Sequence, residues 1–406
     1  MLPYVVQPGD TLLRIARRFH IHAAALLAAN PRLSPAASIA PGLIVFIPEQ
    51  NASCYCVQPG DTVLGVAERF SLSVQSLLAA NPRLDPKRLV PGQLVTLPES
   101  EEGDRLSVVN AGAEYGPSEL ERDLAALEKS YPFLHVQTIG ASVLGLPLYA
   151  LRIGDGARKL HINAAMHANE WITTPLLMRF VEELAAAGAR GGQLAGLDVR
   201  QALGEVTLWA VPLVNPDGAK LAQEGLQPDH PLYHELLQWN HGSRRFRRWK
   251  ANARGVDLND QFPAFWEEEV KRRAADGPGR RDYPGPAPLS EPEARALVDL
   301  TAAERFDMAI ALHTKGQEIY WNYRGYEPPE SEGLARAFGQ ASGYKPVKLS
   351  GSDAGYKDWF IYEYRKPGFT IELGSGVNPL ALDCFEDVYD ELMPLLVRAI
   401  RFLAGQ

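Results

Sequence analysis

Residues 159–170 read KLHINAAMHANE, an apolar run that ends in His167 with Glu170 three positions later. A short apolar run of this kind is typical of a strand that is covered on both faces of a sheet. A lone His-x-x-Glu pair is a common accident in a long chain. The pair predicts a functional site only if other parts of the chain bring further polar groups to it.

Three more apolar runs end in polar groups. VTLWAVPLV, at 206–214, ends in the turn NPDG at 215–218. FDMAIAL ends in His313, and GFTI ends in Glu372. Because open α/β sheets place ligands at the carboxyl ends of their strands, we expect these groups to meet in one crevice.

Helical stretches alternate with the strand-like runs. The segments DLAALEKSY at 123–131 and TPLLMRFVEELAAA at 174–187 read as helices. Short apolar runs between helices favour an α/β fold, with a sheet that is covered on both faces.

Two histidines and a glutamate are the ligand set of a hydrolytic zinc site, in which the fourth position is left for water. His167, Glu170 and His313 supply such a set. A further glutamate that is not a ligand would act as general base on that water, and Glu372 is the candidate. The pattern therefore predicts a hydrolase with one Zn²⁺.

Composition limits the partners of the chain. Its 406 residues are 46% hydrophobic and 22% charged, which is typical of globular domains. The formal net charge of -8 gives no general attraction to nucleic acid or to anionic membranes, so we expect neither as a partner. The chain has no run of 18 apolar residues, so we expect no transmembrane helix. Three cysteines, Cys54, Cys56 and Cys384, do not form a disulfide framework, and their role is left open.

The first part of the chain repeats itself. YVVQPGDT, LLAANPRL and PGLIVFIP are followed by YCVQPGDT, LLAANPRL and PGQLVTLP, and each copy reads as a β-α-α-β unit. A polar, acidic stretch, PESEEGDRLS, then reads as a linker. The predicted organisation is a module at 1–49, a module at 50–99, a linker at 100–110 and an α/β domain at 111–406.

The two modules resemble LysM modules, on the PGDT turn, the Asn-Pro and the Pro-Gly that precedes the last strand, each present twice. The resemblance implies binding of glycans that contain N-acetylglucosamine, in a groove between the first turn and the segment after the second helix. The residues it points to are Gly9, Asp10, Thr11, Asn30, Ile39, Gly60, Asp61, Thr62, Asn81 and Leu89. Caps and turns are an equal alternative for the individual residues. The glycan is either peptidoglycan or chitin.

The remaining domain resembles the zinc carboxypeptidase A family, on HANEWI, NPDG, GVDLN, ALHTKGQ, the Asp-Trp at 358–359 and TIELG. The resemblance implies a mixed sheet flanked by helices. It makes His167, Glu170 and His313 the zinc ligands, and Glu372 the general base and proton shuttle.

The resemblance assigns further roles around the metal. Asp257 would accept a hydrogen bond from a ligand histidine, and Asn259 would bind substrate. The cation that stabilises the oxyanion in the family matches Lys250 best, with Arg247 and Arg248 as rivals. Lysine cannot form the bidentate fork of an arginine.

Two departures from the family bear on the substrate. The arginine that clamps a terminal carboxylate in the family is replaced here by Asp260. The mobile tyrosine of the family would fall near Ser350, where it is missing, and Tyr356 is a candidate replacement close to it in sequence. An aspartate in the place of the clamp predicts a substrate that carries an ammonium group there.

Peptidoglycan stem peptides supply such a group, because meso-diaminopimelate carries an amine and a carboxylate at its far end. LysM repeats before a carboxypeptidase-like domain with RGVDLND resemble bacterial γ-D-glutamyl-L-diamino acid endopeptidases. The resemblance implies cleavage between γ-D-glutamate and meso-diaminopimelate, with the modules holding the enzyme on the same polymer.

Two other functions are alternatives. A zinc carboxypeptidase would release C-terminal amino acids, which Asp260 disfavours. A glycan-binding protein with an inactive enzyme domain is disfavoured because all three ligands and the base are present. The start, MLPYVVQPGDT, has no export signal, so we expect a cytoplasmic or spore-associated protein that acts on the cell wall, as in sporulating bacteria. The oligomeric state is left open.

Overall fold

The chain divides into two units, Met1–Ser107 and Val108–Gln406, in a computed structural model. The described residues of the first unit are 2–6, 15, 26, 29–30, 42–47, 54–57, 62–69, 74–81, 84–85, 89 and 93–96. Those of the second unit are 108–110 and 113–406. Val108 and Val109 donate their backbone N–H groups to the Glu182 carboxylate, so these two residues belong with the second unit.

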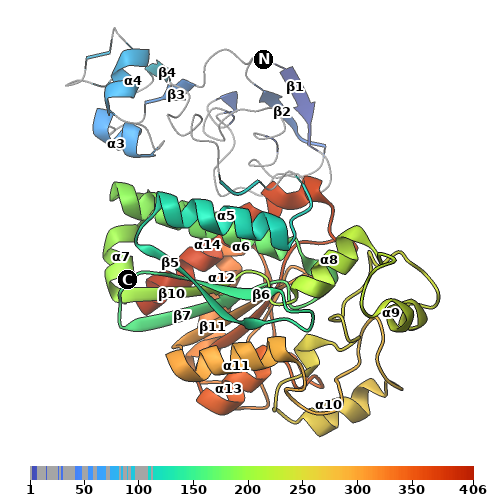
Figure 1. Cartoon of the computed structure of the whole chain (residues 1–406). Helices are drawn as coiled ribbons and strands as arrows, with labels where there is room; N and C mark the ends of the chain where they lie inside the picture. The colour runs from blue at the N-terminus through green and yellow to red at the C-terminus, as the bar shows by residue number, and fades with distance from the viewer. Residues whose placement is uncertain are drawn as a thin grey trace. The chain divides into compact units, whose positions relative to one another are not determined.

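An eight-stranded mixed sheet organises the second unit (Figure 1). Its order is β13-β12-β14-β11-β7-β10-β6-β5. The strands are β5 (Leu134–Ala141), β6 (Pro147–Ile153), β7 (Arg158–Asn163), β10 (Val206–Val211), β11 (Met308–His313), β12 (Glu318–Tyr320), β13 (Lys345–Val347) and β14 (Gly368–Glu372).

The four apolar runs of the sequence form the centre of this sheet. They are β14, β11, β7 and β10, and each is parallel to its neighbour within this group of four. Their carboxyl ends therefore lie at one edge, as predicted. The outer pairs β10–β6, β6–β5 and β12–β14 are antiparallel, which makes the sheet mixed.

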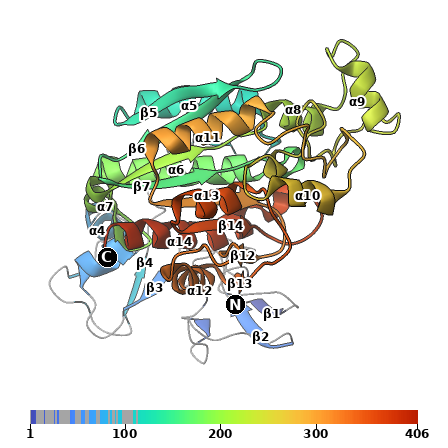
Figure 2. The same cartoon turned by 90° about the horizontal axis from the view of Figure 1, so that it is seen from below.

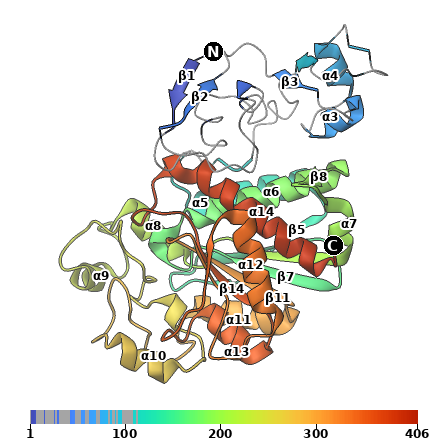
Figure 3. The ribbon, with the colours of Figure 1, turned by 180° about the vertical axis from the view of Figure 1, so that it is seen from behind.

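Helices cover both faces of the sheet because residues alternate between faces along each strand. Leu160 and Ile162 of β7 join a core with α5, α6, α7, α12 and α14, whereas Ala309 and Ala311 of β11 join one with α11 and α13. Figure 2 shows α11 and α13 on one face, and Figure 3 shows α12 and α14 on the other. The helices are α5 (Pro117–Ser130), α6 (Thr173–Arg190), α7 (Val199–Glu205), α8 (Pro216–Glu224), α9 (Tyr233–Trp239), α10 (Trp266–Arg273), α11 (Pro292–Glu304), α12 (Glu330–Ser342), α13 (Tyr356–Tyr364) and α14 (Phe385–Leu403).

Short elements complete the second unit. They are the 3-10 helices η2 (Ala168–Glu170), η3 (Leu258–Asp260) and η4 (Leu382–Cys384), and the hairpin strands β8 (Gln193–Leu194) and β9 (Leu197–Asp198). Two of them carry site residues, since η2 ends in Glu170 and η3 ends in Asp260.

The described parts of the first unit show the ends of both repeats. In the first, β1 (Leu2–Val5) pairs antiparallel with β2 (Ile44–Ile47). In the second, β3 (Cys54–Cys56) pairs antiparallel with β4 (Leu94–Thr96), and α3 (Val63–Arg69) and α4 (Val74–Ala80) lie between them in the chain. Within the described ranges, no helix is long and apolar enough to cross a membrane.

One buried carboxylate predicts how stability depends on pH. Glu293, at the start of α11, is fully buried and accepts a hydrogen bond from the Val143 N–H at 3.0 Å. Burial, with smaller effects of Asp217 and Glu291, raises the pKa of Glu293 to about 7. Because the folded-state pKa lies above the unfolded one, the stabilisation is complete below the unfolded pKa and is lost as pH rises through about 7.

We expect Glu293→Gln to remove this dependence. As pH rises from 4.5 to 8, the unfolding free energy of the unmodified chain should fall relative to that of the variant by about 3 kcal/mol. Urea titrations of both proteins across this range measure the difference. Parallel stability curves would show that Glu293 does not titrate in the folded state.

Candidate metal centre and active site

Two histidines and a glutamate converge at the carboxyl ends of β7 and β11. His167 follows the β7 run and leads into η2, which carries Glu170, while His313 is the last residue of β11. One ligand atom from each lies within 4.8 Å of the others, and all three side chains are buried. His167 Nδ1 and His313 Nδ1 lie 3.0 and 3.1 Å from the two carboxylate oxygens of Glu170, and 3.1 Å from each other.

The contacts of His167 test whether a cation fits here. Its Nε2 lies 3.2 Å from Asp257 Oδ1, which can only accept a hydrogen bond when ionised. With the ring hydrogen on Nε2, toward this carboxylate, the Nδ1 lone pair would face the cluster. A nitrogen lone pair that faces the oxygens of a buried carboxylate favours a cation bound between them. Two imidazole nitrogens and one carboxylate are the donor set that zinc takes in hydrolytic sites.

The Glu170 carboxylate is held by a loop and an amide that the sequence analysis did not identify. The Thr314 N–H donates to Glu170 Oε2 at 3.1 Å, and Asn378 Nδ2 donates to Oε1 at 3.3 Å. Asn378 follows β14 in the chain, so it lies beyond a strand end of the same crevice. Its position after such a strand, before a proline, was the available signal.

Glu372 ends β14 and is the register partner of His313 on β11. Burial raises the pKa of Glu372 to about 7, with Glu170 acting in the same direction and His313 in the opposite one. A carboxylate with a pKa near neutral pH can both accept and return a proton. The register of β14 on β11 places such a carboxylate next to the predicted ligands.

Lys250 reaches the site through Asp257. Its Nζ lies 2.9 Å from Asp257 Oδ2, and its side chain is 17% exposed. Its backbone carbonyl accepts from the Ala168 N–H, which fixes this segment against η2. Arg247 and Arg248 have exposed side chains, so the geometry favours Lys250 among the three cations.

Burial alone would raise the pKa of Asp257, but Lys250 and His167 lower it well below its ordinary value. The carboxylate is fully buried. Asp257 directly precedes η3, and its Oδ1 accepts a hydrogen bond from the Asn259 N–H at 3.3 Å. An ionised Asp257 that contacts both a ligand histidine and Lys250 orients the two groups relative to each other.

Asp260 is less accessible than the sequence suggested. It is 1% exposed, and its Oδ1 accepts from Arg273 of α10 at 2.7 Å. Its Oδ2 is buried and has no hydrogen-bond partner among the described residues. Burial and the nearby Asp257 raise the pKa of Asp260, while Arg273 and Lys250 oppose this.

The structure corrects the role suggested for Tyr356. Its side chain is fully buried and its hydroxyl lies 2.9 Å from Thr301 Oγ1, so it cannot replace the mobile tyrosine of the family. Its backbone N–H donates to Asn259 Oδ1 at 3.2 Å. The Asn259 side chain is partly exposed, and its role in substrate binding stays a prediction.

Several candidate glycan contacts lie outside the described residues, namely Gly9, Asp10, Thr11, Ile39, Gly60 and Asp61. The amides of Asn30 and Asn81 each bond to the preceding helix and to the last strand of their own module. Thr62 Oγ1 accepts from the Gly65 N–H and caps α3, and Leu89 packs partly buried against the core of its module. These contacts match the alternative in which the residues cap helices and form turns. Their role in glycan binding stays a prediction.

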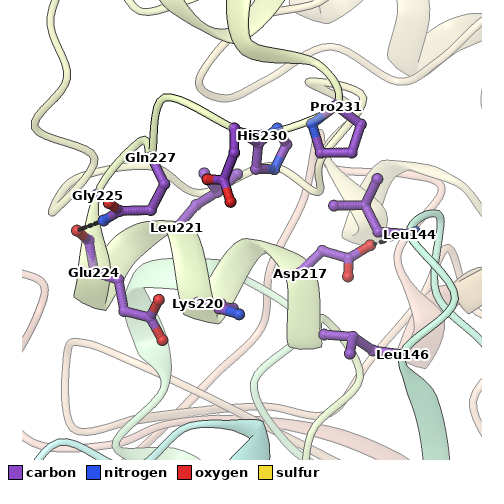
Figure 4. A pocket seen from close by; sticks show the side chains of 11 residues that line it. Leu144, Leu146, Asp217, Lys220, Leu221, Glu224, Gly225, Gln227, His230 and Pro231 are labelled. Atoms are coloured by element: carbon purple, nitrogen blue, oxygen red, sulfur yellow. Dashed lines mark hydrogen bonds between the residues drawn. The ribbon is translucent and has the colours of Figure 1, made fainter.

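A separate hollow lies over α8, with a volume of about 340 Å³ (Figure 4). Its charged lining includes Asp217, Lys220, Glu224 and His230. Among the described residues, one set of three His, Cys, Asp or Glu side chains is close enough together to hold a metal ion. It consists of His167, Glu170 and His313. In the described part of the chain, the hollow over α8 therefore brings together no such set of three.

Comparison with known proteins agrees with this geometry. A family model described as zinc carboxypeptidase matches residues 120–379, and a LysM domain model matches residues 4–48 and 55–98. The chain belongs to the zinc carboxypeptidase family. The predicted mixed α/β fold, the zinc peptidase class and the two LysM modules are thereby confirmed, and the three-residue cluster is suited to one zinc ion.

Individual relatives match most of this zinc carboxypeptidase family member. Gamma-D-glutamyl-L-diamino acid endopeptidase 1 of Lysinibacillus sphaericus is 40% identical over 396 residues, which cover 86% of this chain and 98% of that protein. The uncharacterized protein YqgT of Bacillus subtilis is 41% identical over 292 residues, 71% of this chain and 77% of its own. The structure of thrombin activatable fibrinolysis inhibitor has the same fold at 20% identity, with a TM-score of 0.59 over 75% of this chain and 79% of its own.

Proposed function

We propose that this protein is a zinc-dependent peptidase that hydrolyses the bond between γ-D-glutamate and meso-diaminopimelate in peptidoglycan stem peptides. The convergence of His167, Glu170 and His313 beside Glu372 carries the hydrolytic part of the proposal. The substrate is supported by the 40% identity with the Lysinibacillus endopeptidase, which extends over 98% of that protein.

The residues around the cluster divide the chemistry among them. When bound by the three ligands, zinc supplies a Lewis acid that polarises a carbonyl and lowers the pKa of water. Glu372 takes the proton of the attacking water and then returns it to the leaving amine of diaminopimelate. Lys250 donates hydrogen bonds to the negative charge that develops on the carbonyl oxygen, and Asp257 holds this lysine in place.

The proposed enzyme differs from a carboxypeptidase in the bond that is cut. We expect a peptide with the γ-D-glutamyl linkage to be hydrolysed, and its isomer with the α-linkage to be hydrolysed far more slowly. Appearance of the free amine on diaminopimelate measures both rates. Equal rates on the two isomers would contradict the proposed specificity.

We further propose that the buried Oδ2 of Asp260 accepts a hydrogen bond from the side-chain amine of diaminopimelate. This oxygen has no partner among the described residues, whereas the other oxygen is held by Arg273. A charge-assisted bond to a buried group contributes about 1.5–3 kcal/mol, or a factor of roughly 10–100 in rate.

The conservative variant Asp260→Asn tests this role. We expect the unmodified enzyme to prefer diaminopimelate to 2-aminopimelate, which lacks the amine, and the variant to lose most of that preference. The ratio of kcat/KM for the two peptides measures it. A variant that keeps the full preference would remove Asp260 from substrate recognition.

We propose that the two modules, at 1–49 and 50–99, anchor the enzyme to the glycan strands of peptidoglycan through the turn and groove residues named above. Anchoring raises the effective concentration of the enzyme at the stem peptide without a new catalytic contact. Soluble N-acetylglucosamine oligomers should therefore slow digestion of intact peptidoglycan but not of the free tetrapeptide. Equal effects on both substrates would contradict the anchoring.

The proposed place of action is the cell wall, and a role in sporulating cells is consistent with a stem-peptide substrate. Fractionation of sporulating and growing cells, with an antibody to the full chain, tests both parts. Equal amounts in both kinds of cell, away from the wall fraction, would contradict them.

A further inference from the structure

The loop between β11 and β12 is fastened to the metal cluster at Thr314. The Thr314 N–H donates to Glu170 Oε2, as described above. Its Oγ1 donates to Asn378 Oδ1 at 2.8 Å, and its carbonyl accepts from Asn378 Nδ2 at 2.9 Å. Three hydrogen bonds thus fix the residue that follows His313.

The same loop is fastened to the general base at Gly316. The Gly316 N–H donates to the Gly374 carbonyl at 2.9 Å. A Cβ atom at Gly316 would lie 3.6 Å from the Cβ of Glu372, so this backbone packs directly beside the base. Lys315 is therefore held between a neighbour that contacts Glu170 and a neighbour that contacts Glu372.

Lys315 offers a positive charge that the fold does not use. Its side chain is exposed, and its ammonium has no ion-pair partner in the part of the chain that the structure describes. The nearest acid along the loop, Glu318, accepts a hydrogen bond from the Tyr320 hydroxyl at 2.7 Å.

The cations that the structure holds against buried acids of the site are already paired. Lys250 lies against Asp257, and Arg273 donates to Asp260. Lys357, which is buried, lies 2.5 Å from Asp358. Lys315 differs from these cations, because it is exposed on the loop that follows His313 and has no ion-pair partner among the described residues.

The γ-linkage provides such an anion. When glutamate is joined through its side-chain carbonyl, its α-carboxylate stays free and is separated from the scissile carbonyl carbon by three carbon atoms. Because its bonds are about 1.5 Å long, an extended lysine side chain reaches roughly 6 Å from its Cα. This reach is similar to the length of the carbon chain between the carboxylate and the scissile carbonyl. A carboxylate beside a lysine forms a charge-assisted hydrogen bond.

We propose that Lys315 binds the free α-carboxylate of the γ-D-glutamyl residue and so determines specificity for the γ-linked, unamidated stem peptide. This inference rests on the proposed function. It names a recognition element on the acyl side of the scissile bond, whereas Asp260 was assigned to the leaving side.

Two peptides that differ only at this carboxylate test the proposal. One is L-Ala-γ-D-Glu-meso-diaminopimelate-D-Ala, and the other carries a carboxamide in place of the α-carboxylate. We expect the unmodified enzyme to prefer the carboxylate peptide by roughly tenfold or more in kcat/KM. Lys315→Met should bring this ratio close to one, and Lys315→Arg, which keeps the charge, should retain most of it.

Lys129→Met is the matched control, because Lys129 is exposed in the last turn of α5. It should keep the preference of the unmodified enzyme, and all four proteins should bind equal amounts of zinc. A Lys315→Met variant with an unchanged ratio would overturn the proposal. Equal cleavage of the two peptides by the unmodified enzyme would overturn it while leaving the proposed function intact. Cleavage of neither peptide would refute the proposed function and this inference with it.

Discussion

Glu372→Gln is expected to lower kcat on the stem peptide by roughly 10²–10⁴-fold, the contribution of a positioned general acid–base group. Glutamine has nearly the same shape, but its amide cannot take a proton from water and return it to the leaving amine. Because Glu372 is not among the metal ligands, zinc binding should be retained. Turnover rates, together with metal analysis of the purified variant, measure both effects.

Glu318→Gln provides a control for this substitution. Glu318 is the register partner of Glu372 on the antiparallel strand β12, so the same chemical change is made on the neighbouring strand. We expect a change in kcat of less than tenfold. If Glu372→Gln were no more damaging than Glu318→Gln, Glu372 would not be the base.

His313→Ala is expected to abolish both zinc binding and hydrolysis. It removes one of the three donors that converge within 4.8 Å and leaves too few ligands to hold the ion. Competition with a zinc chelator measures the affinity without reference to activity. The loss should exceed the roughly 10- to 100-fold that removal of an outer partner of a ligand typically causes.

Asp257→Asn makes that smaller change, because Asp257 contacts the ligand His167 and would not touch the ion. We expect its zinc affinity to fall within the 10- to 100-fold range. A His313→Ala variant that bound zinc more tightly than Asp257→Asn would exclude His313 as a ligand.

The convergence of the candidate ligands and the candidate base could be predicted from the sequence, because three of these four residues end apolar runs. His167, His313 and Glu372 end runs that become neighbouring parallel strands, and parallel strands bring their carboxyl ends together. Glu170 follows by local spacing, since it ends the single turn of η2. In these positions periodicity along the chain was enough to predict proximity in the fold.

The contacts that the sequence did not predict depend on how helices and loops pack against one another. Tyr356 begins α13, and the sequence does not tell which side of that helix faces the core, where its hydroxyl meets Thr301. The pairing of Asp260 with Arg273 depends on how α10 packs. Asn378 reaches Glu170 across 208 residues of sequence. Its position after a strand places it at the same edge of the sheet but does not identify Glu170 as its partner.

The central claim is the bond that is cut, and mass spectrometry of one digest tests it most directly. The full chain would be incubated with L-Ala-γ-D-Glu-meso-diaminopimelate-D-Ala, with and without a zinc chelator. We predict release of L-Ala-D-Glu and of diaminopimelate-D-Ala, suppressed by the chelator. Release of D-Ala alone would identify a carboxypeptidase and contradict this account.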